Sequence, residues 1–331
     1  MNQCVLVTGG TGFVAGWTIV ELLKKGYSVR ATVRGARQEE ACRKAVESAV
    51  PSEGRLTFAI ADLMDDGGWQ SAAEGCEYVL HIASPLGNAR DDESLIAAAR
   101  EGTLRVLKAA VAAGARKVVL TSSTAACTPA KPLNRPIDER DWTDPEQPGL
   151  SAYRKSKLLA ERAAWSFMSG QKTALTTILP GAIFGPVLTA DQRGSVDIIR
   201  PLLTGKPPLL PRLAFNVTDV RDLADVHIRA MTTTAGDGER FITLGDPLWF
   251  YEVANILRDR LGKAAAKVPT RRMPDVAARV VALTSPQMKA LLPLLGRTQK
   301  FSRVKAERTL GFVPRSADAT VSDCGRSLIV D

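Results

Sequence analysis

This sequence has little histidine and no closely paired cysteine. Its 331 residues contain only two histidines, His81 and His227, and five cysteines, at positions 4, 42, 76, 127 and 324. No two of these cysteines form a CxxC pair, and the histidines do not have the spacing of metal ligands, so we expect neither a disulfide framework nor a metal site. The cysteines are expected to be reduced thiols, several of them packed in the interior as small apolar side chains.

Long hydrophobic runs are also missing. No stretch reaches the roughly 18 consecutive apolar residues that a membrane-spanning helix needs. Residues 1–3 lead directly into an apolar segment and leave no room for the n-region and h-region of a signal peptide, so we expect a cytoplasmic protein with no membrane partner. A hydrophobic fraction of 45% and a charged fraction of 24% are those of an ordinary globular protein, which argues against disorder, collagen and coiled coil.

Positive charge is in excess, because 44 Lys and Arg residues face 35 Asp and Glu residues and give a net charge of +9. Such an excess suggests nucleic-acid binding, since Lys and Arg neutralise phosphates. The basic residues are spread along the chain, however, and the densest group, Arg297 to Arg308, is interleaved with Phe301, Val304 and Leu310, which predicts the polar face of a helix. We therefore expect no nucleic-acid partner; an enzyme that binds an anionic cofactor explains the charge.

Short β-branched runs alternate with longer helix-like segments over the first 180 residues. Strands are predicted at 4–7, 28–33, 56–60, 78–80, 117–120 and 174–179, and helices over 13–25, 91–113 and 151–168. This alternation is typical of βαβ units and predicts an α/β fold with a parallel sheet. Beyond Pro180, frequent prolines and glycines indicate loops and short elements, which we expect to form a smaller C-terminal lobe over the strand ends.

A glycine-rich loop, TGGTGFVA from Thr8 to Ala15, joins the first strand to the first helix. Two dinucleotide-binding spacings fit it, GxGxxA starting at Gly10 and GxxGxxA starting at Gly9. Glycines permit a positive φ and let backbone amides approach a pyrophosphate, and the helix N-terminus favours the negative charge. The loop therefore predicts that a dinucleotide is bound by Gly9, Thr11, Gly12, Phe13 and Val14.

The end of the second strand distinguishes the two nicotinamide cofactors. In NAD enzymes an Asp or Glu about 20 residues after the loop accepts a hydrogen bond from the ribose 2′-hydroxyl. The segment 31–37 contains no acid, and its Arg34, helped by Arg37, can bind a 2′-phosphate instead. We therefore predict NADPH (NADP+ when oxidised) as the cofactor, with Asp62 and Leu63, which follow the third strand, near the adenine.

A tyrosine and a lysine lie one helical turn apart in the sequence YRKSK, so Tyr153 and Lys157 share a helix face. A nearby ammonium stabilises a phenolate and lowers the phenol pKa, which suits Tyr153 to protonate a developing alkoxide. Ser123 ends the fifth strand, where a hydroxyl can orient a substrate carbonyl beside the phenol. Ser123, Tyr153 and Lys157 are the predicted catalytic residues.

These motifs resemble extended short-chain dehydrogenases/reductases of the dihydroflavonol 4-reductase, cinnamoyl-CoA reductase and aldehyde reductase branch. The resemblance covers nearly the whole chain and is carried by TGGTGFVAG (8–16), HIASP (81–85), TSS (121–123), YRKSK (153–157), VTDVRD (217–222) and LGFVPR (310–315). It implies a Rossmann domain, that is, a doubly wound parallel sheet, over 1–180 with a return segment at about 216–234. The substrate-binding lobe would then comprise 181–215 and 235–331.

The resemblance also implies an activity, which is NADPH-dependent reduction of an aldehyde or ketone by hydride transfer from nicotinamide C4, with alcohol oxidation as the reverse. Ser123 and Tyr153 would bind the carbonyl oxygen, with Tyr153 as general acid, and Lys157 would hold the ribose and tune Tyr153. The cofactor cleft would further be lined by Ala83, Ser84 and Pro85 and, beside the nicotinamide, by Pro180 and Ile183.

The chain departs from plant flavonoid reductases after the serine, because 124–128 contains no asparagine. The segments 81–90 and 184–215 are expected to shape the pocket for a small carbonyl or alcohol substrate. Three alternatives remain: an NAD-retaining nucleotide-sugar epimerase, a hydroxysteroid dehydrogenase and a non-catalytic dinucleotide sensor. A dehydratase is disfavoured because no acid follows Ser123. The protein is expected to be a monomer or a homodimer.

Overall fold

The computed structural model describes residues 3–85 and 91–329. Its centre is a seven-stranded sheet in the order β3-β2-β1-β4-β5-β6-β9, in which every neighbouring pair is parallel. The strands are β1 (Cys4–Val7), β2 (Ser28–Val33), β3 (Leu56–Ile60), β4 (Tyr78–His81), β5 (Lys117–Thr121), β6 (Ala174–Pro180) and β9 (Glu239–Thr243). The predicted doubly wound parallel sheet is confirmed.

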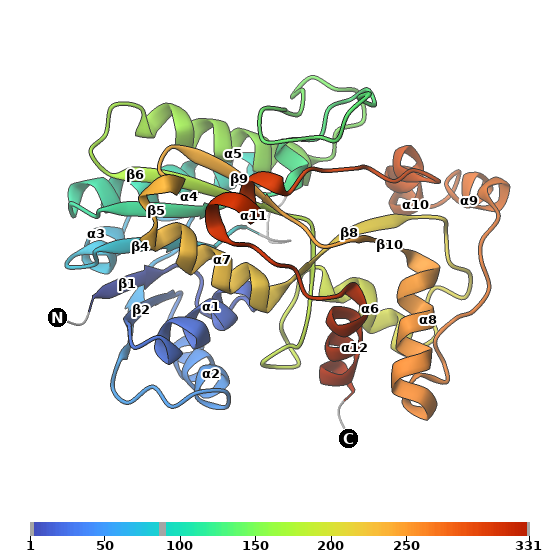
Figure 1. Ribbon diagram of the computed structural model, residues 1–331, viewed down its shortest axis with the longest axis horizontal. Helices are drawn as coiled ribbons and strands as arrows, with labels where there is room; N and C mark the ends of the chain where they lie inside the picture. Colours follow the sequence, from blue (N-terminus) through green and yellow to red (C-terminus); the bar gives the residue numbers. More distant parts are fainter. Residues whose placement is uncertain (1–2, 86–90, 330–331) are drawn as a thin grey trace.

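Helices cover both faces of this sheet (Figure 1). One face carries α1 (Phe13–Lys24), α2 (Ala36–Glu47) and α7 (Val220–Thr232), and the other carries α3 (Trp69–Ala73), α4 (Asp92–Ala112) and α5 (Ala152–Met168). In β1, Val5 and Val7 are buried in the core beneath α1 and α7, whereas Leu6 is buried in the core beneath α4 and α5. A strand that is buried on both faces needs a continuous apolar run, which explains the sequence CVLV.

The strand order reverses at β1, which pairs with β2 on one side and with β4 on the other. At such a point the crossover connections leave in opposite directions, and a crevice opens at the carboxyl ends of the strands. The glycine loop follows β1, the HIASP segment continues from β4 and the TSS segment ends β5. The parallel sheet therefore brings these three segments to one edge.

A second, three-stranded sheet builds the C-terminal lobe, in the order β10-β8-β7. Here β7 (Ala182–Phe184) runs parallel to β8 (Ala214–Asp219), and β10 (Pro247–Trp249) runs antiparallel to it. The surrounding helices α6 (Val196–Leu203), α8 (Phe250–Leu261) and α12 (Ala317–Leu328) share an apolar core with this sheet. Phe13 is buried in the same core, so the first residue of α1 anchors the glycine loop between the two sheets.

Two expectations about the C-terminal part need correction. The predicted return segment 216–234 is too short, because β9 joins the central sheet and α11 (Val304–Leu310) packs against β9 and α7. The helix predicted over Arg297–Arg308 begins only at Val304, and Phe301 forms a β-bridge with Ile137 instead. Segments assigned to the lobe from sequence thus complete the layers around the central sheet.

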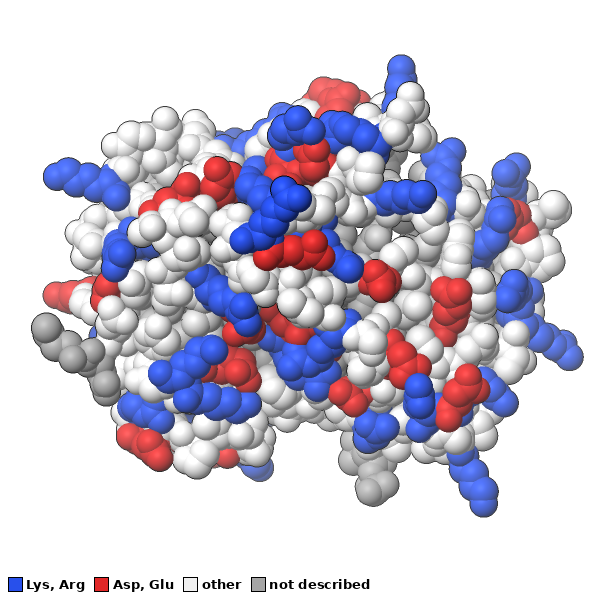
Figure 2. All heavy atoms as spheres, viewed as in Figure 1, with Lys and Arg blue, Asp and Glu red and all other residues white. Residues whose placement is uncertain are grey.

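The remaining elements are short. They are α9 (Asp275–Val281), α10 (Pro286–Leu291) and the 3₁₀ turns Thr124–Ala126, Thr234–Gly236, Gly262–Ala265 and Leu292–Leu294. Within 3–85 and 91–329, no helix is long and apolar enough to cross a membrane. On the face drawn in Figure 2, Lys and Arg side chains are interspersed with Asp and Glu. Residues 86–90, the end of one predicted pocket segment, lie outside the described residues.

Candidate active site

The glycine loop packs directly against the segment that follows β4. Gly9 has φ 73°, and its N–H donates to Thr32 Oγ1 at 2.9 Å. A Cβ on Gly9 would lie 3.0 Å from the Cβ of Ala83. Both the left-handed φ and this contact require glycine. They leave the loop backbone bare, which is the surface that a dinucleotide pyrophosphate needs.

The N-terminus of α1 has no capping side chain. Gly12 is its N-cap residue, and the first turn contains no acidic residue. The first N–H groups of a helix have no intrahelical acceptor and the helix dipole favours an anion there, so this end is suited to phosphate. Thr11 and Gly12 are exposed and Val14 is half-buried, whereas the Phe13 side chain is buried. Phe13 therefore offers a ligand only its backbone.

A buried threonine, which the sequence reasoning did not single out, ties the loop to β4. Thr8 Oγ1 accepts the N–H groups of Ile82 at 3.0 Å and Ala83 at 2.9 Å. It also lies 2.9 Å from His81 Nδ1, and since the hydroxyl accepts the two N–H groups, its own proton is directed to the imidazole. Burial lowers the pKa of His81 to about 3, with the charge of Lys157 acting in the same direction, so the imidazole is neutral. The only sequence signal was the position of Thr8 immediately before the glycines.

The two arginines predicted at the 2′-phosphate lie where β2 ends and α2 begins. Arg34 and Arg37 are both exposed, and neither makes an ion pair with another residue in the described part of the chain. The nearest following acid, Glu39, is in the first turn of α2 and pairs with Arg43 at 3.2 Å. The end of β2 is thus positively charged and exposed to solvent, which is the environment that a 2′-phosphate favours.

The ends of β3 and β4 supply the other predicted contacts of the cofactor. Asp62 Oδ1 accepts the N–H of Met64 at 3.0 Å, so the carboxylate closes a local turn. Leu63 lies against α4, where a Cβ on Gly102 would come within 2.8 Å of the Leu63 Cβ. The other three, Ala83, Ser84 and Pro85, are half-buried at the end of β4.

Ser123, which follows β5, caps the 3₁₀ turn that begins immediately after it. Ser123 is 8% exposed, and its Oγ accepts the N–H of Ala125 at 3.1 Å as the N-cap of a 3₁₀ turn. That contact occupies a lone pair and leaves the hydroxyl proton for another partner. Thr124 links the same turn to the end of β6 by donating to the Pro180 carbonyl at 3.3 Å. Pro180 is buried, and Ile183 in β7 is half-buried between the two cores.

Tyr153 lies in the first turn of α5 and is 42% exposed. Desolvation by the surrounding protein raises the pKa of Tyr153, and the hydrogen bond with the Ser123 hydroxyl acts to lower it. From the sequence we expected Lys157 to lower this pKa. In the structure the pKa of Tyr153 is raised and Lys157 is not among the causes of the shift, so that expectation is wrong.

Lys157 follows one turn later and points toward β5. Its Nζ donates to the Thr121 carbonyl at 3.3 Å. Burial lowers the pKa of Lys157 to about 8, and the negative charge of Glu161 opposes this shift. The three predicted catalytic residues are thus brought together: Ser123 interacts with Tyr153, and Lys157 is hydrogen-bonded to Thr121, the last residue of β5.

A buried ion pair underlies α5, and it was missed from sequence. Glu161 is 1% exposed and lies 2.8 Å from Arg240 Nε of β9. The carboxylate also accepts from Ser122 Oγ at 2.5 Å and from Thr177 Oγ1 at 2.9 Å. Arg240 stacks on Trp142 with its guanidinium carbon 3.6 Å from the ring centroid. In the sequence, Glu161 follows Lys157 by four residues, but this i, i+4 spacing is equally typical of an exposed helix face.

The second histidine is structural as well. His227 Nδ1 donates to the Leu223 carbonyl at 2.7 Å, and Nε2 lies 2.7 Å from Thr121 Oγ1. Burial lowers the pKa of His227 to about 4. Over the described ranges, no group of three or more His, Cys, Asp or Glu side chains is placed to hold a metal ion.

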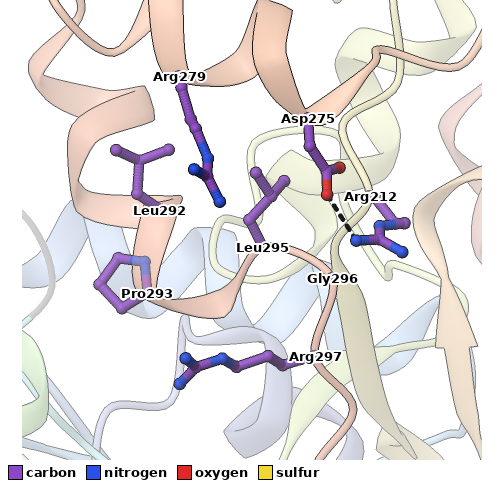
Figure 3. Close-up of a pocket in the computed structure, with 8 residues that line it drawn as sticks. All are labelled: Arg212, Asp275, Arg279, Leu292, Pro293, Leu295, Gly296 and Arg297. Atoms are coloured by element: carbon purple, nitrogen blue, oxygen red, sulfur yellow. Dashed lines mark hydrogen bonds and ion pairs between the residues drawn. The ribbon is translucent and has the colours of Figure 1, made fainter.

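A cavity of about 630 Å³ lies elsewhere, on the C-terminal lobe (Figure 3). Arg212 is held at its wall by Asp275, at 2.5 Å, and Arg279 extends from α9 toward Leu295. Its lining residues are Arg212, Asp275, Arg279, Leu292, Pro293, Leu295, Gly296 and Arg297. None of them is a predicted catalytic or cofactor residue, and only Arg212 lies in the segment 184–215 that was expected to shape the substrate pocket.

Sequence comparisons place the chain among reductases. A model of the NAD dependent epimerase/dehydratase family matches residues 5–245. An anthocyanidin reductase of Vitis vinifera is 32% identical over 291 residues, which cover 81% of this chain and 83% of that protein. Cinnamoyl-CoA reductase 1 of Petunia hybrida is 34% identical over 260 residues, covering 77% of each chain.

Comparison of structures agrees with the sequence. The Gre2 protein of Candida albicans, solved in complex with NADPH, superposes with a TM-score of 0.82 at 27% identity and covers 98% of both chains. The similarity therefore extends over both sheets, the C-terminal lobe included.

Proposed function

Because this chain belongs to the NAD dependent epimerase/dehydratase family, we propose that it is an NADPH-dependent oxidoreductase that reduces an aldehyde or ketone and catalyses the reverse alcohol oxidation. The observation that carries the proposal is the cluster of Ser123, Tyr153 and Lys157 on the same sheet edge as the bare glycine loop. A carbonyl placed there meets a hydroxyl, a phenol and an ammonium beside a phosphate-binding helix end.

The cofactor site is built from this chain's backbone and two arginines. Gly9, Gly12 and the uncapped start of α1 would receive the pyrophosphate, and Arg34 with Arg37 would bind the 2′-phosphate. NADPH, when bound, supplies a hydride from its nicotinamide. The Gre2 protein of Candida albicans, which holds NADPH, supports this choice of cofactor.

Tyr153 is proposed as the group that moves the proton. Its raised pKa keeps the phenol protonated at neutral pH, as a general acid for carbonyl reduction requires. Ser123, whose hydroxyl proton is available, donates a second hydrogen bond to the carbonyl oxygen and fixes it beside the phenol. Lys157 carries a positive charge below its pKa of about 8 and stabilises negative charge that develops on the phenol oxygen.

The proposed substrate is a small aldehyde or ketone that enters between the two sheets. The relatives named anthocyanidin reductase and cinnamoyl-CoA reductase support a carbonyl-reducing chemistry but differ from each other in substrate. The segment 124–128, which contains no asparagine, and the half-buried Ile183 would shape the pocket of this chain. A flavonoid is therefore not the proposed substrate.

The test is NADPH and NADH oxidation by the purified protein with aromatic aldehydes, β-keto esters and ketosteroids. Turnover with NADPH well above NADH is expected, and Tyr153→Phe should lower it strongly while NADPH binding persists. Tyr251→Phe, on α8, is the matched control, since among residues 3–85 and 91–329 its hydroxyl hydrogen-bonds only Glu252, at 3.4 Å. Failure to oxidise either cofactor, with a nicotinamide that co-purifies and stays bound, would overturn the proposal in favour of an epimerase.

A further inference from the structure

Two of the five cysteines lie in contact at the start of β1. Cys4 is the first residue of that strand, and Cys76 precedes β4 by two positions. Their Sγ atoms are 3.4 Å apart. The backbones are already adjacent, because Glu77 N–H donates to the Cys4 carbonyl at 3.0 Å. A disulfide needs an Sγ–Sγ distance of about 2.0 Å, so the two sulfur atoms must approach each other for the bond to form.

The two thiols have unequal environments. The Cys76 thiol hydrogen-bonds Cys4, which lowers the pKa of Cys4 to about 7 and raises that of Cys76 far above the usual range. Arg30 adds positive charge beside Cys4, and it is held in place by the carbonyls of Ala72 at 3.0 Å and Glu74 at 2.6 Å. Cys4 is half-buried whereas Cys76 is buried, so Cys4 is the thiol that a reagent reaches and Cys76 is the thiol that resolves it.

The other three cysteines lack these properties. Cys42, Cys127 and Cys324 are buried, whereas Cys4 is half-buried. Burial raises the pKa of Cys42 and of Cys324 to about 12 each. Within the described residues, none of the three contacts another thiol. The fold thus distinguishes one accessible, paired thiol from three inert ones.

We propose that Cys4 and Cys76 form a hydroperoxide-reactive site that closes a reversible disulfide between β1 and the turn before β4. The Cys4 thiolate attacks the terminal oxygen of a hydroperoxide; the O–O bond breaks, Cys4 becomes a sulfenic acid and the alcohol or water leaves with a proton. Cys76 sulfur then attacks Cys4 sulfur, the S–O bond breaks, and hydroxide leaves as water with the Cys76 proton. Two thiols are oxidised and one hydroperoxide is reduced.

The place of this pair in the fold predicts what the disulfide does. Cys4 begins β1, and the glycine loop follows the other end of that strand (Figure 1). The disulfide therefore ties two strands at the sheet edge opposite Ser123 and Tyr153. We expect it to stabilise the fold against unfolding and to leave carbonyl reduction unchanged.

Treating the full-length protein with hydrogen peroxide, followed by thiol titration and peptide mapping without reductant, tests the site. We expect two thiols to be lost, one Cys4–Cys76 peptide to appear, and dithiothreitol to reverse both. Cys76→Ser should instead leave a sulfenic acid on Cys4 that dimedone traps, and Cys324→Ala should behave as the wild type. Oxidation should raise the melting temperature of the wild type and of Cys324→Ala but not of Cys4→Ser.

Peptide mapping of the wild type decides the proposal even if a variant does not fold. Absence of the Cys4–Cys76 peptide, or its formation in no greater yield than other cysteine pairs, overturns it. Its formation in equal yield from urea-unfolded protein overturns it as well, because the fold would then contribute nothing. The result is independent of carbonyl reduction, so failure of either proposal leaves the other standing.

Discussion

Replacing Arg240 by methionine isolates the contribution of the ion pair beneath α5. Methionine retains much of the arginine stem but removes both guanidinium contacts with Glu161, at 2.8 Å and 3.3 Å. It also removes the two hydrogen bonds to the carbonyls of Glu139 and Asp141 and the stacking on Trp142. The Glu161 carboxylate then stays buried with only hydroxyl and indole donors.

The expected loss is large because the charge left behind is desolvated. Removing one partner of a buried ion pair costs about 3–5 kcal/mol, most of it from the uncompensated charge. At about 2–4 °C per kcal/mol, the melting temperature should fall by on the order of 10 °C. Adding Glu161→Gln to Arg240→Met removes the stranded charge, so the double variant should be more stable than Arg240→Met alone.

Urea and thermal unfolding followed by circular dichroism measure these differences. Arg193→Met is the matched control, because Arg193 pairs with Asp197 four residues later, at 3.6 Å, and the arginine side chain is 69% exposed. Such surface pairs contribute about 0.3–0.5 kcal/mol. If Arg240→Met costs no more than Arg193→Met, the pair is not a structural support of α5.

A second readout concerns catalysis, because Glu161 acts on Lys157. Its negative charge opposes the lowering of the Lys157 pKa. Glu161→Gln should therefore lower that pKa further below about 8, and the alkaline limb of the kcat/KM profile should move to lower pH. An unchanged profile in a folded variant would show that Glu161 has no electrostatic influence on the site.

The remaining predictions concern the cofactor, the catalytic pair and the lobe. Tyr153→Phe should lower kcat by about 10²–10⁴-fold, the contribution of a positioned acid, with NADPH binding retained in a fluorescence titration. Arg34→Ala should weaken NADPH binding by about tenfold or more, since a charge-assisted hydrogen bond contributes about 1.5–3 kcal/mol, and leave NADH binding unchanged; equal losses would refute the 2′-phosphate contact. Lys157→Met should stabilise the fold at pH 7 by about 3 kcal/mol, because the folded-state pKa of Lys157 is about 8 rather than 10.5. The unfolded chain binds that proton more tightly, so this advantage should shrink as pH rises from 8 to 10.5; a constant difference would contradict the burial argument. Arg279→Ala should leave reduction of an uncharged aldehyde unchanged, because the cavity it lines shares no residue with the site; a raised KM would place that cavity on the substrate path.

The strands of the central sheet were predictable where burial on both faces forces apolar residues. β1 is an unbroken apolar run, and β1, β2 and β3 span the predicted residues. β9 escaped prediction because two charged residues, Glu239 and Arg240, begin it. The buried charge of Arg240 is paired with Glu161, which is 79 positions away in the sequence. A strand whose buried charge pairs with a residue distant in the sequence has no local sequence pattern by which it can be predicted.

The positions of the site residues follow from the sheet, but their protonation does not. Sequence spacing places Tyr153 and Lys157 on one face of α5, and a strand-end serine belongs at the carboxyl edge. The pKa of Lys157 depends on how deeply the lysine is buried against β5 and on the charge of Glu161. A YxxxK motif specifies neither the burial of the lysine nor the charge beside it, because both arise from tertiary packing.

The protonation of the catalytic pair matches the reductive direction. The pKa of Tyr153 is raised, so the phenol holds its proton across the neutral range, and a carbonyl that becomes an alcohol must take up one proton. Alcohol oxidation needs the reverse, a phenolate ready to accept that proton, and the raised pKa of Tyr153 makes this phenolate scarce at neutral pH. A charged Lys157 stabilises negative charge on the phenol oxygen in both directions, and Lys157 loses that charge as the pH rises past about 8. The two pKa shifts therefore favour reduction at neutral pH and predict that both activities fall above about pH 8.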